Sequence, residues 1–220
     1  MKGFVVHYKK LGHRRKSLTI QLEAARIPAV FVDHIDRDSI VEHDLGMFDR
    51  RRKYWLFGRR IRPVDMAITL SHLHCLQLAR ERAEASLILE DDAILAEGFS
   101  GSLSQCHGQL PAGWDLCFLG DGCGFHIPEN QRQPGIFVYE KGHGPTDWGG
   151  AGATRCTDSY LVTPAAANRI LEHASCLKHS VRLPYDWWLN DVIRLLGLRV
   201  YWAEPTMVTQ GSQSVYKSSY

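Results

Sequence analysis

Short apolar runs alternate with helical patterns along the N-terminal part of the chain, and this alternation constrains the fold more than any other feature. GFVVHY (3–8) predicts a buried strand, RRKSLTIQLEAARI (14–27) a helix that Pro28 terminates, and AVFVDHID (29–36) a second strand. A strand, a helix and a strand in this order favour a parallel sheet with a right-handed crossover. The opening of the chain therefore predicts an α/β fold.

The alternation continues toward the C-terminus. Residues 62–85 predict a long helix, for which Asp65 just after Pro63 is a candidate N-cap. A chain of 220 residues can bury one sizeable core, so we expect a single α/β domain whose mostly parallel central sheet is flanked by helices. Further strands are predicted at 86–89, 114–120, 135–141, 158–162 and 198–204, and further helices at 164–174 and 184–197.

Three adjacent carboxylates, Glu90, Asp91 and Asp92, follow the apolar run SLIL. Two unit charges about 4 Å apart repel by roughly 4 kcal/mol near a protein surface, so this cluster is costly without a nearby cation. Ligands of open α/β sheets bind where strands end, and Mg²⁺ and Mn²⁺ prefer carboxylate oxygens and substrate phosphates. The cluster thus indicates a divalent-metal site that would stabilise a leaving diphosphate. The alternative is a helix N-terminus, although a cap needs only one acid.

Two further polar positions lie near predicted strand ends. Asp33 ends the second strand, where α/β nucleotide sites often place an acid against a ribose hydroxyl, but no GxGxxG precedes it and a dinucleotide is not expected. The alternative is a solvent-exposed strand end. His72 and His74 are two residues apart on a helix and cannot share a zinc ion. His72, next to Ser71, is either a polar substrate contact or a hydrogen-bonded core residue.

A basic and aromatic segment spans residues 50–62. Its arginines and lysine alternate with Tyr54, Trp55 and Phe57, a pattern that can bind single-stranded nucleic acid or an anionic membrane surface. The net charge of the whole chain is only +2, so we expect no nucleic-acid partner. The segment is interpreted as a solvated loop that faces a phosphorylated or membrane-borne substrate.

The segment PYDWWLND places Asp186 in the first turn of a helix beside Trp187 and Trp188. Sugars pack their C–H faces on aromatic rings while their hydroxyls bond to polar groups, so this segment suits a glycan. The alternative is an acid at a helix N-terminus next to core tryptophans.

The remaining features concern the cellular compartment. Six cysteines show no CxxC pair, and the chain has no signal-like apolar run near its start, so free buried thiols are expected. No stretch reaches the roughly 18 apolar residues of a membrane span. We expect a cytoplasmic protein, alone or in peripheral contact with the anionic inner face of the membrane.

Several blocks of the sequence resemble glycosyltransferase family 25, which includes bacterial lipopolysaccharide galactosyl- and glucosyltransferases and relatives of the procollagen galactosyltransferases. FVVHYKKLGHRR, QLEAARIPAVFVDHID, ITLSHLHCLQLA and SLILEDDAIL carry the resemblance in the N-terminal half. WDLCFLG, DSYLVTPAAANRIL, PYDWWL and VYWAEPTMVTQGSQS continue it in the same order. The resemblance therefore covers nearly the whole chain.

The resemblance implies a GT-A-like, Rossmann-related fold, a UDP-sugar donor and Mn²⁺ or Mg²⁺, with inversion at the anomeric carbon. It implies a nucleotide-sugar-binding half (about 1–100), an acceptor-side half (about 101–210) and a polar tail (211–220). Glu90 and Asp92 would be the metal-side acids and Gln210 a weaker third ligand. Asp186 is the candidate base, with Trp187 and Trp188 on the acceptor side. The donor-binding positions would be His7, Tyr8, Arg15, Asp33, Ser71, His72 and Asp91.

The predicted function is metal-dependent, inverting transfer of a hexose, galactose or glucose, from a UDP-sugar to a glycan or glycolipid acceptor such as lipopolysaccharide or lipooligosaccharide. Two departures from the family pattern bear on this prediction: His7-Tyr8 stands where the family usually has Asn-Leu, and Val64-Asp65 where it has Gly-Glu. The alternatives are a catalytically silent glycan- or nucleotide-binding module of the same fold and a nucleotidyltransferase.

Overall fold

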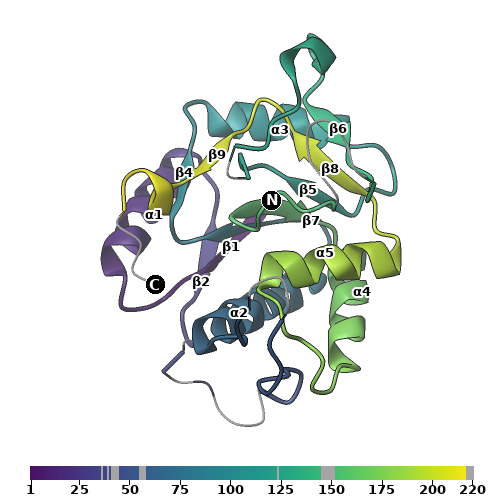
Figure 1. Cartoon of the computed structure of the whole chain (residues 1–220). Coiled ribbons are helices and arrows are strands. Elements are labelled where there is room, and N and C mark those ends of the chain that lie inside the picture. The colour runs from purple at the N-terminus through teal and green to yellow at the C-terminus, as the bar shows by residue number, and fades with distance from the viewer. Residues whose placement is uncertain are drawn as a thin grey trace.

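The computed structural model describes residues 1–35, 37–38, 40, 45–54, 58–122, 124–144 and 152–216. Its centre is a seven-stranded sheet with the order β2-β1-β3-β7-β5-β8-β6, beside a two-stranded sheet of β4 and β9 (Figure 1). The strands are β1 (Lys2–Val6), β2 (Ala29–Val32), β3 (Ser86–Glu90), β4 (Ala93–Leu95), β5 (Leu116–Phe118), β6 (Val138–Glu140), β7 (Ser159–Val162), β8 (Val200–Ala203) and β9 (Val208–Gln210).

Five of the seven central strands run in one direction. β2, β1 and β3 are mutually parallel, and β5 and β8 form a second parallel pair. β7 lies between these groups and is antiparallel to both neighbours, while β6 runs antiparallel to β8 at the edge. The predicted α/β class with a mostly parallel sheet is confirmed.

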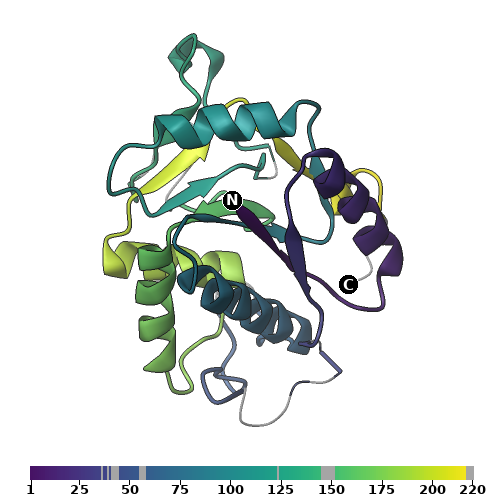
Figure 2. The same ribbon diagram turned by 180° about the vertical axis from the view of Figure 1, so that it is seen from behind.

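Helices cover both faces of the sheet (Figures 1 and 2). One face packs against α2, α4 and α5, and the other against α1 and α3. Successive side chains of β3 serve the two cores in turn, because neighbouring residues of a strand point to opposite faces. Ile88 joins the first core, whereas Leu87 and Leu89 join the second, and all three are fully buried. The helices are α1 (Gly12–Ala24), α2 (Pro63–Arg80), α3 (Phe99–Gln109), α4 (Pro164–Ser175) and α5 (Tyr185–Leu196).

The first helix ends earlier than predicted. α1 stops at Ala24, and Arg26 adopts a left-handed conformation with φ 57°. The Ile27 N–H then bonds back to the Leu22 carbonyl, which closes the helix before Pro28 is reached. The helix is therefore terminated by this turn and not by the proline.

Contrary to the prediction, Asp65 is not the N-cap residue of α2 but stabilises the start of the helix from within its first turn. Arg62 is the N-cap residue, and Asp65 is the third residue of the helix. The Asp65 carboxylate accepts the Arg62 backbone N–H at 2.9 Å, so it satisfies an N-terminal donor from within the first turn. α2 also ends at Arg80, before the predicted end at residue 85.

Sequence analysis missed α3 and the β4–β9 pair. α3 contains two glycines and several serines, which weakens its helical pattern, and β4 and β9 have three residues each. The five described cysteines are free thiols, as predicted, but only Cys75, Cys106 and Cys117 are buried, whereas Cys156 is half-buried and Cys176 is exposed. Cys123 lies outside the described residues. Across the described ranges, no helix combines the length and apolar character that a membrane crossing requires.

Candidate active site

Polar side chains gather at one edge of the central sheet. The parallel strands β1, β2, β3 and β5 all end there, and antiparallel β7 begins there. Because the ends of these strands meet at the same edge, residues far apart in the chain become neighbours. The strand ends contribute His7, Tyr8, Asp33, Glu90, Asp91, Asp92, Asp121 and Asp158.

Asp91 faces the protein interior. One carboxylate oxygen contacts His7 Nδ1 at 2.8 Å and accepts the Tyr8 backbone N–H at 3.1 Å, and the other accepts a bond from Arg14 Nη1 at 3.1 Å. Arg14 and Asp91 are both buried. Arg14 is thus a cation that offsets the charge of the acidic turn, and Asp91 ties the end of β1 and α1 to that turn.

Asp92 has a buried carboxylate oxygen without a hydrogen-bond partner. Its Oδ2 accepts the Ser212 backbone N–H at 3.3 Å, whereas no described group donates a hydrogen bond to Oδ1. Burial and the neighbouring charge of Glu90 raise the pKa of Asp92. Its backbone carbonyl accepts the Gly211 N–H at 2.7 Å, and a Cβ at Gly211 would lie 2.8 Å from that carbonyl oxygen. The second sheet therefore holds the acidic turn in place.

A small cavity brings together three of the predicted site residues. Gln210 pairs with Ala93 across the β4–β9 ladder and so lies beside the acidic turn. Gln210, Glu90 and Asp186 line one cavity of about 170 Å³. Asp65, Ile68, Cys156, Thr157, Pro184 and Tyr185 complete its lining.

Asp186 has an environment that suits a general base. It lies in the first turn of α5, and burial together with the charge of Glu90 raises its pKa to about 6. A carboxylate with a pKa near the working pH is ionised yet basic enough to take a proton. The cavity thus brings a carboxyl group with a pKa of about 6 together with Glu90 and Gln210.

His72 belongs to a buried hydrogen-bond network. Its ring is fully buried and stacks on Tyr185 with a centroid separation of 4.0 Å. Nδ1 lies 3.2 Å from the Tyr160 hydroxyl and Nε2 lies 3.4 Å from Glu90 Oε1, while Thr157 Oγ1 donates to the same Glu90 oxygen at 3.2 Å. The network thus holds one carboxylate oxygen of Glu90, Oε1, in place. His72 is therefore a hydrogen-bonded core residue in contact with the acidic motif.

The other predicted donor-side residues lie at the same edge but outside the cavity. Arg15 and Asp33 form an ion pair of 2.6 Å in which both side chains are more than a third exposed. The Tyr8 hydroxyl donates to Asp38 at 3.3 Å. Ser71 is buried, and its hydroxyl donates to the Ile35 carbonyl at 3.3 Å.

The two tryptophans of α5 point in different directions, because neighbouring residues of a helix are rotated by about 100°. Trp187 is 44% exposed, whereas Trp188 is buried and packs on Tyr185 with ring centroids 5.8 Å apart. Only Trp187 presents a ring surface to a ligand. Trp55 and Phe57 of the basic segment lie outside the described residues.

Sequence analysis did not single out Asp158 or assign Asp65 to a site. Asp158 is fully buried beside β3, its Oδ1 has no partner among the described residues, and burial and the charge of Glu90 raise its pKa well above the usual range. Gly120 makes room for it, since a Cβ there would overlap the Asp158 carboxylate. Asp65 lines the cavity and is held by Arg59 at 2.7 Å. An acid directly before the strand SYLV was the available signal for Asp158.

The donor set suits a hard divalent cation. Within the described ranges, no three His, Cys, Asp or Glu side chains are arranged to hold a metal ion by themselves. Mg²⁺ is usually held by one or two carboxylates together with water and substrate phosphates, so a three-residue cluster is not required. Asp92 Oδ1 is buried next to Glu90 and has no hydrogen-bond partner within the described part of the chain, so it fits such a ligand.

Comparison with known proteins identifies a family similarity. A sequence profile described as glycosyltransferase family 25 (LPS biosynthesis protein) matches residues 1–121. No curated protein matches the chain.

Two solved structures have a broadly similar course of the chain. One is a mutant of Drosophila β-1,4-galactosyltransferase 7 in complex with manganese, UDP-Gal and xylobiose, with a TM-score of 0.45, 11% identity, and coverage of 95% of this chain and 69% of that one. The other is mouse xyloside xylosyltransferase 1 in its apo form, with a TM-score of 0.41, 12% identity, and coverage of 90% and 69%. Because both TM-scores are below 0.5, neither similarity carries weight for the function.

Proposed function

Because this chain belongs to glycosyltransferase family 25, we propose that it transfers galactose or glucose from a UDP-sugar to a hydroxyl of a glycan acceptor such as lipopolysaccharide or lipooligosaccharide. The observation that carries the proposal is the cavity in which Glu90, Gln210 and Asp186 meet. Glu90 and Gln210 carry oxygens that can bind a metal ion, and Asp186 is a candidate base. Metal-dependent sugar transfer from a nucleotide diphosphate uses both kinds of group.

The proposed step is a direct displacement. The acceptor hydroxyl oxygen forms a bond to the anomeric carbon while the bond from that carbon to the diphosphate oxygen breaks. UDP leaves with the electron pair, and the hydroxyl proton passes to the Asp186 carboxylate. Attack from the face opposite the leaving group inverts the anomeric centre.

Asp186 supplies the proton acceptor. With a pKa of about 6 it is mostly ionised at neutral pH. Its position in the first turn of α5 fixes it in the cavity wall, and a positioned base of this kind contributes roughly 10²- to 10⁴-fold to a rate. Trp187, exposed on the adjacent position of the helix, is the ring on which an acceptor sugar would pack.

Glu90 and Asp92 would hold Mn²⁺ or Mg²⁺, with Gln210 as a weaker neutral ligand. A cation there offsets the negative charge that develops on the leaving diphosphate. The chain itself prepares this position: His72 and Thr157 orient Glu90, and Gly211 and Ser212 hold Asp92.

The proposal is tested by thermal unfolding with a panel of ligands. UDP-galactose, UDP-glucose and UDP-N-acetylglucosamine are each added with Mn²⁺ or with a chelator. A ligand that binds only the folded state raises the unfolding midpoint in proportion to ln(1 + [L]/Kd). We expect a shift for one of the hexose donors that disappears on chelation. No shift with any of these ligands, with or without metal, would contradict UDP-sugar binding.

A further inference from the structure

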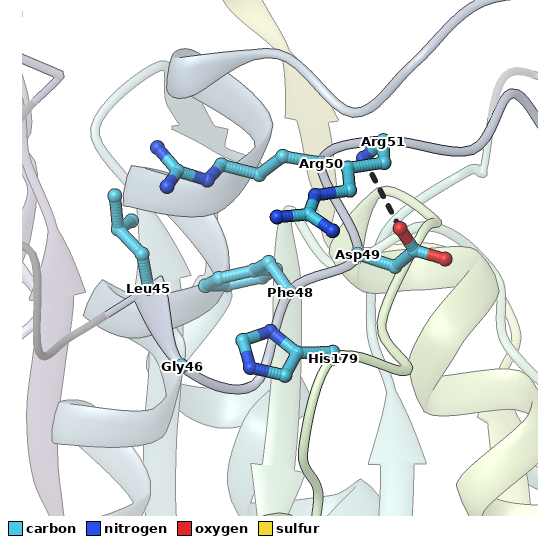
Figure 3. Close-up of a pocket in the computed structure, with 7 residues that line it drawn as sticks. All are labelled: Leu45, Gly46, Phe48, Asp49, Arg50, Arg51 and His179. Carbon is cyan, nitrogen blue, oxygen red and sulfur yellow. Dashed lines mark hydrogen bonds between the residues drawn. The ribbon is translucent and has the colours of Figure 1, made fainter.

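A second, larger cavity lies where the segment from Leu45 to Arg51 meets the loop that precedes α5. It has a volume of about 380 Å³ and is lined by Leu45, Gly46, Phe48, Asp49, Arg50, Arg51 and His179. In Figure 3 the two arginine side chains lie on one side of the Phe48 ring and His179 lies on the other. The cavity thus combines an apolar floor with cationic groups.

Backbone pairing holds the cavity walls together. The segment after residue 45 runs along the loop that precedes α5, with Phe48 bridged to Val181 in parallel. The Asp49 N–H donates to the Val181 carbonyl at 2.9 Å, and the His179 N–H donates to the Gly46 carbonyl at 2.9 Å. Phe48 and Val181 are buried. Arg50 and Arg51 therefore directly follow a segment that backbone hydrogen bonds attach to the loop before α5.

The described residues that line the cavity carry a net positive charge. Asp49 is the only acid among the described residues that line it, and its carboxylate is already engaged. It accepts the backbone N–H groups of Arg51 and Arg52 at 3.1 and 3.2 Å and pairs with Arg182 at 2.9 Å. These hydrogen bonds and the Arg182 charge outweigh burial and lower the pKa of Asp49. The cations around it thus outnumber this single carboxylate.

The cavity is linked to the candidate base by a short piece of chain. Arg182, the partner of Asp49, precedes Asp186 by four residues, which span at most about 14 Å when extended. Pro184 and Asp186 line the smaller cavity. The residue that pairs with Asp49 is therefore attached to the chain within about 14 Å of the candidate base.

We propose that this second cavity is a subsite for an anionic sugar of the acceptor, a sugar that carries a phosphate or carboxylate group. Guanidinium groups pair with both anions through two parallel hydrogen bonds, which supplies specificity as well as affinity. The apolar floor of Leu45 and Phe48 suits the C–H face of the same sugar. The inference rests on the proposed function, because it names the class of acceptor for that reaction.

The geometry favours a sugar over a membrane surface. Binding at a bilayer surface uses aromatic side chains that project into the lipid interface. Among the described aromatic residues of this part of the chain, Phe48 is buried and Tyr54 is half-buried, so neither projects from the surface, and Trp55 and Phe57 lie outside the described residues. Arg50 and Arg51 instead line a cavity of about 380 Å³, a volume that suits a small ligand.

The test measures binding of small probes to the full chain by NMR of arginine side-chain N–H groups. The probes are glucose 6-phosphate, glucuronate, glucose and inorganic phosphate. We expect glucose 6-phosphate or glucuronate to bind at least tenfold more tightly than glucose and inorganic phosphate. The double variant R50Q/R51Q should weaken that binding at least tenfold. The matched control is R52Q/K53Q, which also removes two positive charges from the same segment, at positions that do not line the cavity.

Three results would overturn the proposal. Equal weakening in R52Q/K53Q would show a general charge effect. Inorganic phosphate binding as tightly as the charged sugars would show a free-anion site. A double variant that no longer sediments with phosphatidylglycerol vesicles but keeps its affinity for glucose 6-phosphate would assign the cations to a membrane. Variants that fail to unfold cooperatively are replaced by R50K/R51K, which keeps the charge and loses the bidentate geometry. This variant should bind the charged sugars more weakly than the parent does, and unchanged affinity would contradict the proposal.

Failure of this inference is distinguishable from failure of the proposed function. The R50Q/R51Q variant should bind UDP-hexose in the presence of Mn²⁺ as the parent does, because the cavity of Glu90 and Asp186 is separate. A parent chain that binds glucose 6-phosphate through Arg50 and Arg51 but no UDP-sugar would support the subsite and contradict sugar transfer from UDP.

Discussion

Arg14 of α1 donates a hydrogen bond of 3.1 Å to Asp91, the middle acid of the turn after β3, and both side chains are buried. The pair divides the acidic motif into two parts. Asp91 is directed inward and joins α1 to the sheet edge. Glu90 and Asp92 are the acids that would bind the proposed metal ion.

The first prediction concerns the stability of this pair. Replacing Arg14 with methionine leaves Asp91 buried without its cation, and removing one partner of a buried ion pair typically costs about 3–5 kcal/mol. We expect a loss of this size in urea unfolding. The matched control is Arg15→Gln, which breaks the half-exposed pair with Asp33 and should cost at most about 1 kcal/mol. A loss in Arg14→Met as small as that in Arg15→Gln would show that Asp91 does not depend on Arg14 for stability.

The second prediction tests Asp186 as the base. Asp186→Asn removes the proton acceptor while keeping size and polarity, so kcat should fall by about 10²- to 10⁴-fold. The Kd for UDP-hexose with Mn²⁺, measured by calorimetry, should stay within about twofold. Asp191→Asn on the same helix, which breaks an exposed pair with Arg194, should retain the parent rate. Unchanged turnover in Asp186→Asn would rule out Asp186 as the base.

The third prediction concerns pH. Burial and the charge of Glu90 raise the pKa of Asp186 to about 6, and a base acts only in its deprotonated form. We therefore expect kcat/KM to rise with pH up to about 6 and to level off above it, since this ratio reports the free enzyme. This rise of kcat/KM with pH should be absent from the residual activity of Asp186→Asn. If the rise persists in the variant, it reports the titration of another residue, and Asp186 is not its source.

The fourth prediction separates the metal role of Asp92 from a structural one. The raised pKa of Asp92 means that its ionised form is disfavoured in the folded state, so Asp92→Asn should not lower the unfolding midpoint at neutral pH without metal. The variant should lose the additional midpoint shift that Mn²⁺ gives in the presence of UDP. A variant that keeps this Mn²⁺-dependent shift would exclude Asp92 as a ligand.

The fifth prediction concerns the room that Gly120 leaves for Asp158. A methyl group at residue 120 would overlap the buried Asp158 carboxylate, and overpacking of this kind typically costs about 1–3 kcal/mol. Gly101 lies inside α3 with open space around its Cβ position, so Gly101→Ala should stabilise the chain by about 0.5–1 kcal/mol. Urea unfolding of both variants gives the comparison. Equal effects at the two glycines would show that Asp158 can move away.

The sequence was sufficient for those features that follow from local patterns. The apolar runs and helical periods predicted the α/β class, and the acids after SLIL predicted a polar site at a strand end. Such features depend on residues that are close in the chain. Helix ends were less predictable, because the left-handed turn at Arg26 and the capping role of Asp65 depend on hydrogen bonds that the residue types alone leave open.

Only the tertiary structure decided how the acids of the site differ from one another. Glu90, Asp91 and Asp92 are alike as residues, but Arg14 takes Asp91 into the interior while Asp92 keeps an oxygen without a partner among the described residues. The meeting of Glu90, Gln210 and Asp186 likewise depends on the β4–β9 pairing and on the packing of α5. The physical reason is the same in each case: burial, charge pairing and cavity shape arise between segments that are distant in sequence, and no local pattern encodes them.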